Sequence, residues 1–195
     1  AGSATATIYG TAALDTSNKK FGTASLYLDG PQGPTGDWIA YDLPQVIGLN
    51  DFCVEFWIYL PFSVENPTYD YSTPYTVNDS CSLDVDYFAE SYLLYLYDEN
   101  ANELYEILGD IIFDQWQHIA FYRISGVFYL AVDGVVTLSP ATAEINITTL
   151  ENVIGDYFTL RGDYNLATAW IDEVRVTFDS PVYGAANFSV PGGPF

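Results

Sequence analysis

Short runs of alternating apolar and polar residues, separated by turn-forming residues, make up most of this chain. In residues 52–60 one set of alternate positions is purely apolar, whereas the other set carries Cys53, Glu55, Trp57 and Tyr59. A period of two is typical of a β-strand that turns one side to a core and the other at least partly to water. The pattern therefore predicts a strand over this run.

Turn residues extend the same pattern along the chain. Asp133-Gly134 separates the apolar runs 127–132 and 135–138, and Asp-Gly between two such runs is a strong signal for a β-hairpin. No segment has a helical period. The other candidate strands are 25–30, 37–42, 92–98, 104–112, 117–124, 153–160 and 169–178. Many short strands at this spacing predict an all-β fold, an antiparallel β-sandwich.

Length and composition fit one large domain with a substantial core. The chain has 195 residues, of which 49% are hydrophobic and 17% aromatic, and this excludes a disordered protein. The least regular stretch is 61–91, which is rich in Pro, Tyr and Asp. A loop of that length inside a compact domain is usually functional or a local decoration. We therefore expect a single domain over 1–195 with an insertion at about 61–91.

The charge of the chain narrows the choice of partners. With 26 acidic and 5 basic residues the net charge is −21, and no Lys or Arg occurs between Lys20 and Arg123. Such a field repels nucleic acids and anionic membranes. No apolar run approaches the roughly 20 residues that span a bilayer, so we expect no membrane insertion. The acidity fits solubility in a salty or extracellular setting, and it also fits carboxylates that hold Ca²⁺.

Two cysteines, Cys53 and Cys81, leave two interpretations open. Their separation by 28 positions contains no CxxC spacing, which argues against a zinc site. A disulfide between them would stabilise the fold by roughly 3–4 kcal/mol. The alternative is two buried free thiols in a protein made in a reducing compartment. Of these two interpretations, we predict the disulfide.

Four segments in a fixed order resemble a known family. They read FGTASLYLDG at 21–30, FCVEFWIY at 52–59, WQHIA at 116–120 with FYLAVDG at 128–134, and IDEVRV at 171–176. Together they are similar to the laminin-G-like, concanavalin A-like lectin/glucanase superfamily. The resemblance implies a concanavalin A-like jelly roll and a binding role more often than chemistry. It also implies that the closing strand is followed by a tail that packs back onto the sheet.

The end of the chain adds a finer resemblance. Tyr183, Asn187 and Phe188, followed by Pro191, are similar to the ending of tailed-phage virion proteins of this family. This implies a virion surface protein, either a capsid decoration or a tail-associated module. Its partners would be other virion proteins, in homo-oligomeric or symmetric copies. The alternative is an extracellular carbohydrate-binding or adhesion domain of a cellular protein.

Catalysis is a weak interpretation of this sequence. Glycoside hydrolases need two carboxyl groups set close together across a scissile bond. The nearest candidates, Asp84, Asp86 and Glu90, do not match the carboxylate motif of related hydrolases. His118 is the only histidine, and no G-x-S-x-G or H-E-x-x-H pattern supports it. We expect His118 to be structural and the chain not to be an enzyme.

A structural calcium ion is a further implication of the resemblance. In this superfamily one calcium often lies near the first and last strands. Asp172, with Asp29 or Asp37, would supply carboxylate ligands for such an ion. The alternative is that Asp172 pairs with Arg175 or accepts hydrogen bonds from backbone N–H groups.

Tyrosines and aspartates interleave in the predicted insertion and suggest a carbohydrate or partner contact. Aromatic rings stack on the apolar faces of pyranoses, while carboxylates accept hydrogen bonds from sugar hydroxyls. The tyrosines could equally pack the insertion onto the sandwich or contact a neighbouring subunit. The candidate contact residues are Tyr69, Tyr71, Tyr75, Asp84, Asp86 and Tyr87.

Overall fold

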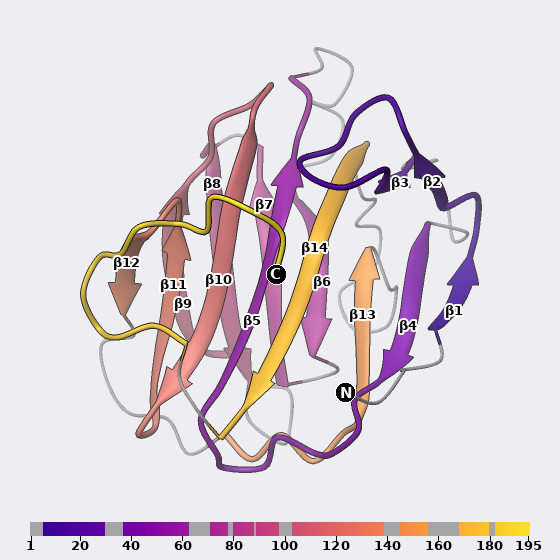
Figure 1. Ribbon diagram of the computed structural model, residues 1–195. Coiled ribbons are helices and arrows are strands. Elements are labelled where there is room, and N and C mark those ends of the chain that lie inside the picture. The colour runs from indigo at the N-terminus through magenta and orange to yellow at the C-terminus, as the bar shows by residue number, and fades with distance from the viewer. Residues whose placement is uncertain are drawn as a thin grey trace.

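The strands of this chain assemble into two facing sheets because each buries its apolar side against the other. The computed structural model describes residues 6–29, 37–62, 71–77, 80–87, 89–97, 103–138, 145–155, 168–179 and 182–195. In this part of the chain two antiparallel sheets, each of seven strands, lie face to face (Figure 1). The predicted all-β antiparallel sandwich is confirmed. Among the described residues there is no helix long and apolar enough to cross a membrane.

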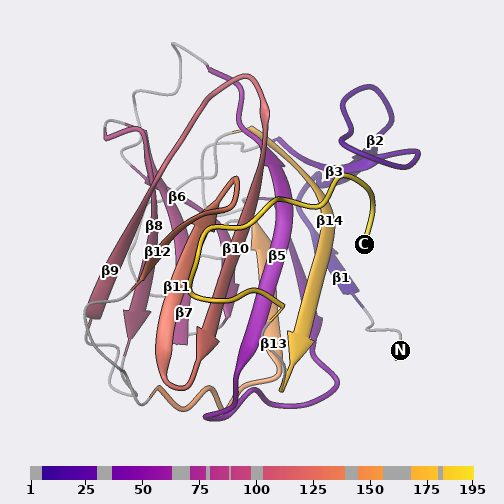
Figure 2. The same ribbon diagram turned by 60° about the vertical axis from the view of Figure 1, so that its left-hand side comes forward.

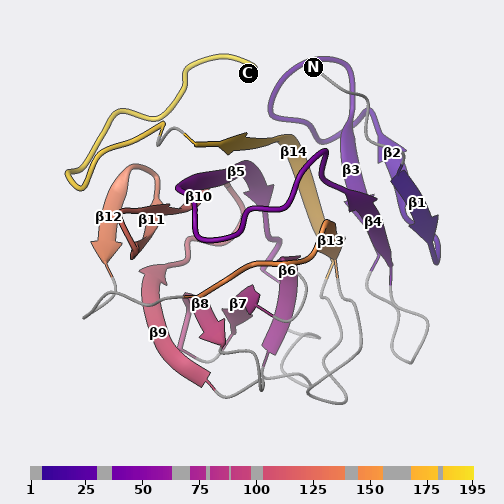
Figure 3. The ribbon, with the colours of Figure 1, turned by 90° about the horizontal axis from the view of Figure 1, so that it is seen from below.

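The sheet nearer the viewer in Figure 1 is called the front sheet, and the other is called the back sheet. In order across the front sheet the strands are β12 (Val135–Leu138), β11 (Val127–Val132), β10 (Trp116–Ile124), β5 (Phe52–Tyr59), β14 (Ala169–Phe178), β3 (Ser25–Leu28) and β2 (Ala13–Asp15). In order across the back sheet they are β1 (Ala6–Tyr9), β4 (Trp38–Asp42), β13 (Glu151–Gly155), β6 (Tyr71–Val77), β7 (Cys81–Asp86), β8 (Ser91–Tyr97) and β9 (Glu103–Asp110). Seen from below, the sheets form two layers, and the C-terminal tail, residues 182–195, crosses the outer side of the front sheet (Figure 3).

The core lies between the two sheets and follows the alternation seen in the sequence. From β5, Phe56 and Ile58 point inward and are fully buried, and they meet Leu83 from β7 and Leu94 from β8. Each fully buried side chain of this size contributes roughly 1.5–3 kcal/mol through the hydrophobic effect. The apolar positions of the predicted strands are therefore the ones that hold the sheets together.

The prediction of an irregular insertion at 61–91 is wrong for most of its length. Residues 71–77 and 81–86 form β6 and β7, which are neighbours in the middle of the back sheet. In β7 alternate apolar residues face the core, while the polar residues between them face outward. A Pro inside a strand is tolerated at a bulge, and Pro74 lies in a register shift between β6 and β7. Because Pro and Asp interrupt the alternation of apolar residues, the sequence pattern does not predict this pair of strands.

The hairpin turns of the front sheet need left-handed backbone conformations. Asp133 and Gly134, which connect β11 to β12, have φ values of 49° and 79°. Two consecutive positive φ values are typical of the tight turns that match the twist of a hairpin. The predicted hairpin is confirmed, and its turn has a second constraint. A Cβ atom at Gly134 would lie 2.1 Å from the carbonyl oxygen of Phe188 in the tail.

The two cysteines are free thiols, which corrects the predicted disulfide. Cys53 points to the outer side of the front sheet, where it packs with Tyr122 and Tyr129. Cys81 points from the back sheet into the core between the sheets. The front sheet therefore separates the two sulfur atoms, and no disulfide geometry can be reached without moving a strand. The alternative interpretation, two buried free thiols, matches the structure.

Candidate functional site

The outer side of the front sheet carries a row of four aromatic residues from four neighbouring strands. Tyr27 of β3 is paired with Trp170 of β14, Trp170 with Tyr59 of β5, and Tyr59 with Trp116 of β10. Because cross-strand partners point to the same face, the four rings lie side by side. We call Tyr27, Trp170, Tyr59 and Trp116 the aromatic row. All four rings are partly exposed to solvent.

The rings of the aromatic row contact one another along its length. Ring centroids are 5.0 Å apart for Tyr27 and Trp170, 5.5 Å for Trp170 and Tyr59, and 5.8 Å for Tyr59 and Trp116. The rings of Trp170 and Tyr59 are nearly perpendicular, with an interplanar angle of 85°. Edge-to-face contacts of this kind stabilise aromatic pairs beyond their buried area. Each ring is thus supported by its neighbours.

Polar groups from the end of β2 and from the loop between β2 and β3 hold both indole rings in place. The Trp170 Nε1–H donates to Asp15 Oδ2 at 2.7 Å, and the Trp116 Nε1–H donates to Asn18 Oδ1 at 3.2 Å. Asp15 is itself held by Ser17, whose hydroxyl and backbone N–H both donate to Asp15 Oδ1 at 2.6 and 2.7 Å. Together with the Trp170 contact, these bonds lower the pKa of Asp15 to about 2. The row is therefore pre-organised beside an ionised carboxylate.

The same loop also covers outward-facing residues next to the aromatic row, namely Asp172 of β14 and its cross-strand partner Trp57 of β5. The backbone N–H groups of Lys20 and Phe21 donate to Asp172 Oδ2 at 2.9 and 3.0 Å. The Lys20 ammonium lies 3.9 Å from the centroid of the Trp57 ring. Trp57 is consequently buried, and His118, its cross-strand partner, is buried beside it. Figure 1 shows the loop between β2 and β3 lying across the upper end of β14.

Further along the sheet, a buried carboxylate joins three strands and the tail. Glu55, with 0% of its side chain exposed, accepts hydrogen bonds from Arg175 Nε at 2.8 Å, His118 Nε2 at 3.1 Å and the Tyr183 hydroxyl at 2.5 Å. The carboxylate can only accept, so His118 carries its proton on Nε2. Burial raises the pKa of Glu55, but the hydrogen bonds and the Arg175 charge outweigh it and leave the pKa below its usual value.

The C-terminal tail covers this buried polar cluster. The rings of Tyr183 and Phe188 are stacked with centroids 3.7 Å apart. The tail is fastened at Gly184, whose carbonyl oxygen accepts from the Tyr122 hydroxyl at 2.9 Å, and by the Phe188 N–H, which donates to the Gly134 carbonyl at 3.0 Å. The tail crosses β11, β10 and β5 in Figures 1 and 2. The expected packing of the tail on the sheet is confirmed, and His118 is structural as predicted.

The predicted Tyr/Asp contact surface is not assembled as expected. Tyr75 is 0% exposed, and its hydroxyl donates to Asn152 Oδ1 at 3.0 Å inside the core, so it cannot contact a ligand. Asp84 is 4% exposed and accepts a hydrogen bond from the Thr73 hydroxyl at 3.0 Å. Both predictions are therefore corrected. The reason is the regularity of β6 and β7, which points Tyr75 into the core and holds Asp84 against Thr73 on the outer side of the back sheet instead of on a loop.

The remaining members of that set have other surroundings. Asp86 accepts a hydrogen bond from the Ala89 N–H at 2.8 Å, as a turn residue does. Tyr87 is partly buried and stacks on Phe113 with centroids 6.0 Å apart. Tyr69 and the side chain of Tyr71 lie outside the described part of the chain. A contact role for these four residues stays a prediction.

Asp29, Asp37 and Asp172 do not form a metal-binding group. Asp172 accepts three backbone hydrogen bonds, and Asp37 is buried with its oxygens bonded to Thr11 and to the Asp29 N–H. Donors that already point at a carboxylate place positive charge where a cation would bind, so these residues do not fit Ca²⁺. Among the described residues no group of three His, Cys, Asp or Glu side chains could hold a metal ion. The alternative of backbone N–H partners for Asp172 is confirmed.

The pattern of the concanavalin A-like lectin/glucanases superfamily, in its laminin-G-like form, matches residues 33–179. That range contains ten of the strands described above, from β4 to β13, together with β14. The chain belongs to this superfamily. The resemblance seen in the four sequence segments is thereby confirmed, and the jelly-roll sandwich is the fold that membership implies.

Solved structures similar to this superfamily member include binding domains of clostridial toxins. The botulinum neurotoxin serotype D binding domain has a TM-score of 0.66 and 16% sequence identity, and the match covers 95% of this chain and 44% of that one. The botulinum neurotoxin type G receptor binding domain has a TM-score of 0.66 and 14% identity over 89% and 42%. The binding domain of Paraclostridial Mosquitocidal Protein 1 has a TM-score of 0.68 and 12% identity over 95% and 45%.

These likenesses define a shared fold. The chain spans less than half the length of each of those toxin domains, and at such low identity only the fold is shared. No curated protein sequence matches the chain. The finer resemblance to tailed-phage virion proteins stays a prediction.

Sequence reasoning did not single out the aromatic row. Tyr59 stands at an outward position of the strand predicted at 52–60, Trp170 is the second residue of the strand predicted at 169–178, and Trp116 directly precedes the strand predicted at 117–124. A signal existed in each strand separately, namely an aromatic residue at the last or first outward position. The four rings are neighbours because of the strand order and register, and a single sequence does not reveal either of these.

Proposed function

We propose that this chain is a non-enzymatic carbohydrate-binding domain displayed at an extracellular surface, and that the aromatic row is its binding surface. The observation that carries the proposal is the alignment of four partly exposed rings from four strands, with both indoles fastened by Asp15 and Asn18. Pyranose rings have apolar faces that stack on aromatic side chains, and pre-organised rings lose little entropy when a sugar binds.

Membership of the superfamily supports binding of carbohydrate. Its name covers both lectins and glucanases, so the fold alone does not separate binding from hydrolysis. One similar structure is the binding domain of botulinum neurotoxin DC in complex with SialylT, matched with a TM-score of 0.66. That complex belongs to the toxin domain. For this chain it supports a search among glycans.

The pKa directions of two carboxyl groups on the front sheet, Asp15 and Glu55, favour binding over hydrolysis. A glycosidase needs a carboxylic acid whose pKa is raised so that it can protonate the leaving group. Asp15 and Glu55 have lowered pKa values instead. Asp84, the nearest sequence candidate, is buried beside Thr73. These observations support a non-enzymatic role.

The biological setting has two versions. The ending around Tyr183 and Phe188 supports a virion surface, with symmetric copies on a capsid or tail as partners. The alternative is an extracellular binding domain of a cellular protein. Immuno-electron microscopy with antibodies against the chain distinguishes them. Symmetric labelling of virus particles supports the first version, and labelling confined to a cell surface or a secreted monomer rules it out.

A glycan array followed by calorimetry tests the binding function. The intact chain should bind at least one glycan class above background, and Trp116→Ala and Trp170→Ala should each weaken that binding about tenfold, which corresponds to roughly 1.4 kcal/mol. Thermal melting checks that both variants remain folded. Tyr9→Ala is the matched control, because Tyr9 is a 41% exposed ring on the back sheet.

Two results would contradict the proposal in different ways. If the intact chain binds no glycan above background, the carbohydrate-binding function fails. If folded Trp116→Ala and Trp170→Ala bind as well as the unmodified chain while Tyr9→Ala does not, the binding surface lies on the back sheet. The stack of Tyr9 on Trp38 would then be the site to examine.

A further inference from the structure

We propose, building on the carbohydrate-binding function above, that the aromatic row binds an unbranched, uncharged oligosaccharide laid across the strands. The proposal concerns the shape and charge of the ligand. Three observations bear on it: the width of the row, its length, and the polar groups that border it.

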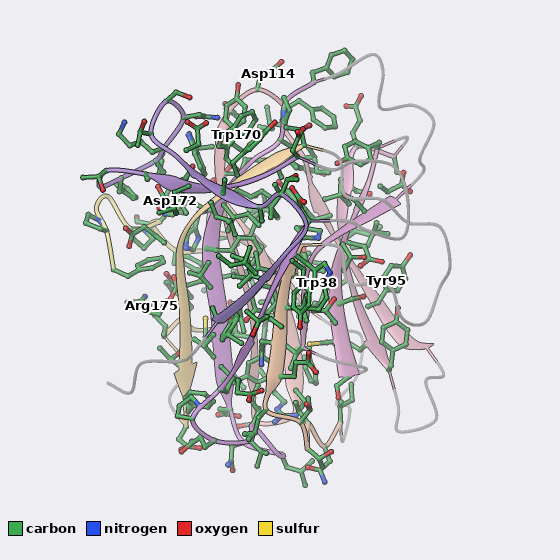
Figure 4. The ribbon with its side chains drawn as sticks, turned by 90° about the vertical axis from the view of Figure 1, so that its right-hand side faces the viewer. Trp38, Tyr95, Asp114, Trp170, Asp172 and Arg175 are labelled. Atoms are coloured by element: carbon green, nitrogen blue, oxygen red, sulfur yellow. The ribbon has the colours of Figure 1, made fainter. Side chains whose placement is uncertain are left out.

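Each strand contributes only one residue to the aromatic row, so the row is one residue wide in the direction of the strands. Tyr59 is the last residue of β5, Trp116 is the first residue of β10, and Trp170 is the second residue of β14, so the sheet ends at this row. Figure 4 shows Trp170 toward that end of the molecule, below Asp114 in the view. On the other side, Lys20 and Phe21 cover the next row of the sheet. Among the described residues, the exposed part of the row is therefore a narrow strip, and such a strip fits a linear chain better than a branched glycan.

The length of the strip is that of several sugar units. Successive ring centroids are 5.0, 5.5 and 5.8 Å apart, and each gap is comparable with one pyranose unit in a chain. The row crosses four strands, which lie about 4.8 Å apart in a sheet. A single terminal sugar would cover one or two of the four rings. A ligand that uses the whole row must contain several consecutive units.

The polar border of the row offers acceptors. Asp15 is ionised, with a pKa of about 2, and Asp29 accepts from the Tyr27 hydroxyl at 3.0 Å. Acceptors of this kind bind sugar hydroxyl groups, which are donors, and repel carboxylate or sulfate groups. The net charge of −21 adds to that repulsion at low salt.

The described cations beside the row and on the front sheet are already engaged. The Lys19 ammonium donates to the Thr16 carbonyl at 2.6 Å, and the Lys20 ammonium rests on the Trp57 ring. Arg175 pairs with Glu55 at 2.5 Å. Recognition of an anionic sugar typically uses a guanidinium or ammonium group that faces the ligand. The charge pattern of the strip is thus complementary to a neutral, hydroxyl-rich chain.

The geometry also separates this ligand from a protein partner. A stable protein interface covers about 800 Å² on each side, with a polar rim around a broad apolar centre. A strip one residue wide, closed on one side by the loop that contains Lys20, does not offer such an area. We therefore take the ligand of the aromatic row to be an oligosaccharide and not a protein.

A series of neutral, unbranched oligosaccharides, from disaccharide to hexasaccharide, tests length by calorimetry. Affinity should rise with each added unit until the row is filled and then level off. Matched pairs that differ only in a terminal sialic acid or uronic acid test charge. The anionic member should bind at least about tenfold more weakly at low salt, and the difference should shrink as salt is raised.

Asp15→Asn provides a matched variant for the charge argument. The asparagine has one side-chain oxygen, so it can replace the acceptor for Ser17 or the acceptor for Trp170 but not both, and it removes the negative charge. Binding of neutral oligosaccharides should weaken, because Asp15 fastens Trp170 and borders the row, whereas the ratio of anionic to neutral affinity should rise by about three- to tenfold; an unchanged ratio would contradict the charge argument. Thermal melting before titration confirms that the variant is folded.

The outcomes separate the two proposals. Absence of binding to every glycan removes the carbohydrate-binding function itself. Binding that is lost in Trp170→Ala but prefers anionic glycans, or that is already complete with a monosaccharide, leaves the function intact and overturns this inference. Length-dependent binding of neutral chains, lost in Trp170→Ala and kept in Tyr9→Ala, supports both.

Discussion

Arg175 reaches Glu55 because the closing strand contains a β-bulge. In β14, Asp172 is paired with Trp57 of β5, and Arg175 is paired with Glu55, so three steps on β14 match two on β5. Glu173, inside this shift, has a φ of 52°. Without the bulge, Asp172 and Arg175 would point to opposite sides of the sheet. With it, both face outward, and the guanidinium lies 2.5 Å from the buried carboxylate.

Glu55→Gln should destabilise the chain by about 2–3 kcal/mol. Breaking a buried ion pair by removing one partner usually costs more, but Arg175 is 34% exposed and keeps some hydration. Urea unfolding followed by tyrosine and tryptophan fluorescence measures the change. Glu173→Gln is the matched control, because Glu173 accepts only an exposed hydrogen bond from the Phe195 N–H in the described network. Equal losses in both variants would contradict the role of Glu55.

The stabilisation by Glu55 should depend on pH in a defined direction. The pKa of Glu55 is lowered below 4.5 in the folded chain, so the folded state binds protons less readily than the unfolded chain. Its contribution is therefore fully present above pH 4.5 and is lost as the pH falls through the lower folded value. The difference in unfolding free energy between the unmodified chain and Glu55→Gln should shrink on acidification. A difference that grows toward low pH would contradict this sign.

Gly134→Ala should loosen the C-terminal tail. The residue has a φ of 79°, and a Cβ atom would lie 2.1 Å from the Phe188 carbonyl oxygen. The backbone strain should destabilise the chain by about 1–3 kcal/mol, and limited proteolysis with mass spectrometry should show faster cleavage of the tail. Gly126→Ala, with a φ of 82° in the other hairpin turn, is the control for backbone strain. Equal tail cleavage in both variants would rule out the close contact as the cause.

Both cysteines should be unreactive in the folded chain. Burial raises the pKa of the Cys81 thiol to about 12 and the pKa of Cys53 still further, so very little thiolate exists at neutral pH. A chromogenic disulfide reagent should label no thiol in the native chain and 2 per chain in denaturant. Cys53→Ser, with one thiol after denaturation, calibrates the assay. No label in denaturant without a reducing agent would mean that the disulfide exists.

Thermal stability should not respond to calcium. The carboxylates of Asp37 and Asp172 already accept backbone hydrogen bonds, and a ligand stabilises a fold only if it binds the native state. Melting in EDTA and in excess CaCl₂ should give the same midpoint. Asp172→Asn should lower the midpoint equally in both solutions. A midpoint that rises with calcium in the unmodified chain and not in the variant would restore the calcium site.

The strands of the front sheet are predictable because their pattern is local. The run at 52–60, the hairpin through Gly134 and the strand at 169–178 each show alternation or turn residues within a few positions. The pair at 71–77 and 81–86 is not recognised, since proline, aspartate and tyrosine interrupt its alternation. Tyr75 is therefore predicted to be a surface contact residue, although it is buried.

The amino-acid pattern therefore accounts for the antiparallel sandwich, because burial of alternate apolar residues is decided strand by strand. The candidate site depends on relations between strands. Tyr27, Trp170, Tyr59 and Trp116 are up to 143 positions apart and meet only through strand order and register. Arg175 meets Glu55 only through the bulge in β14. Register and bulges are set by the packing of the whole sheet, so only the tertiary structure brings these side chains together.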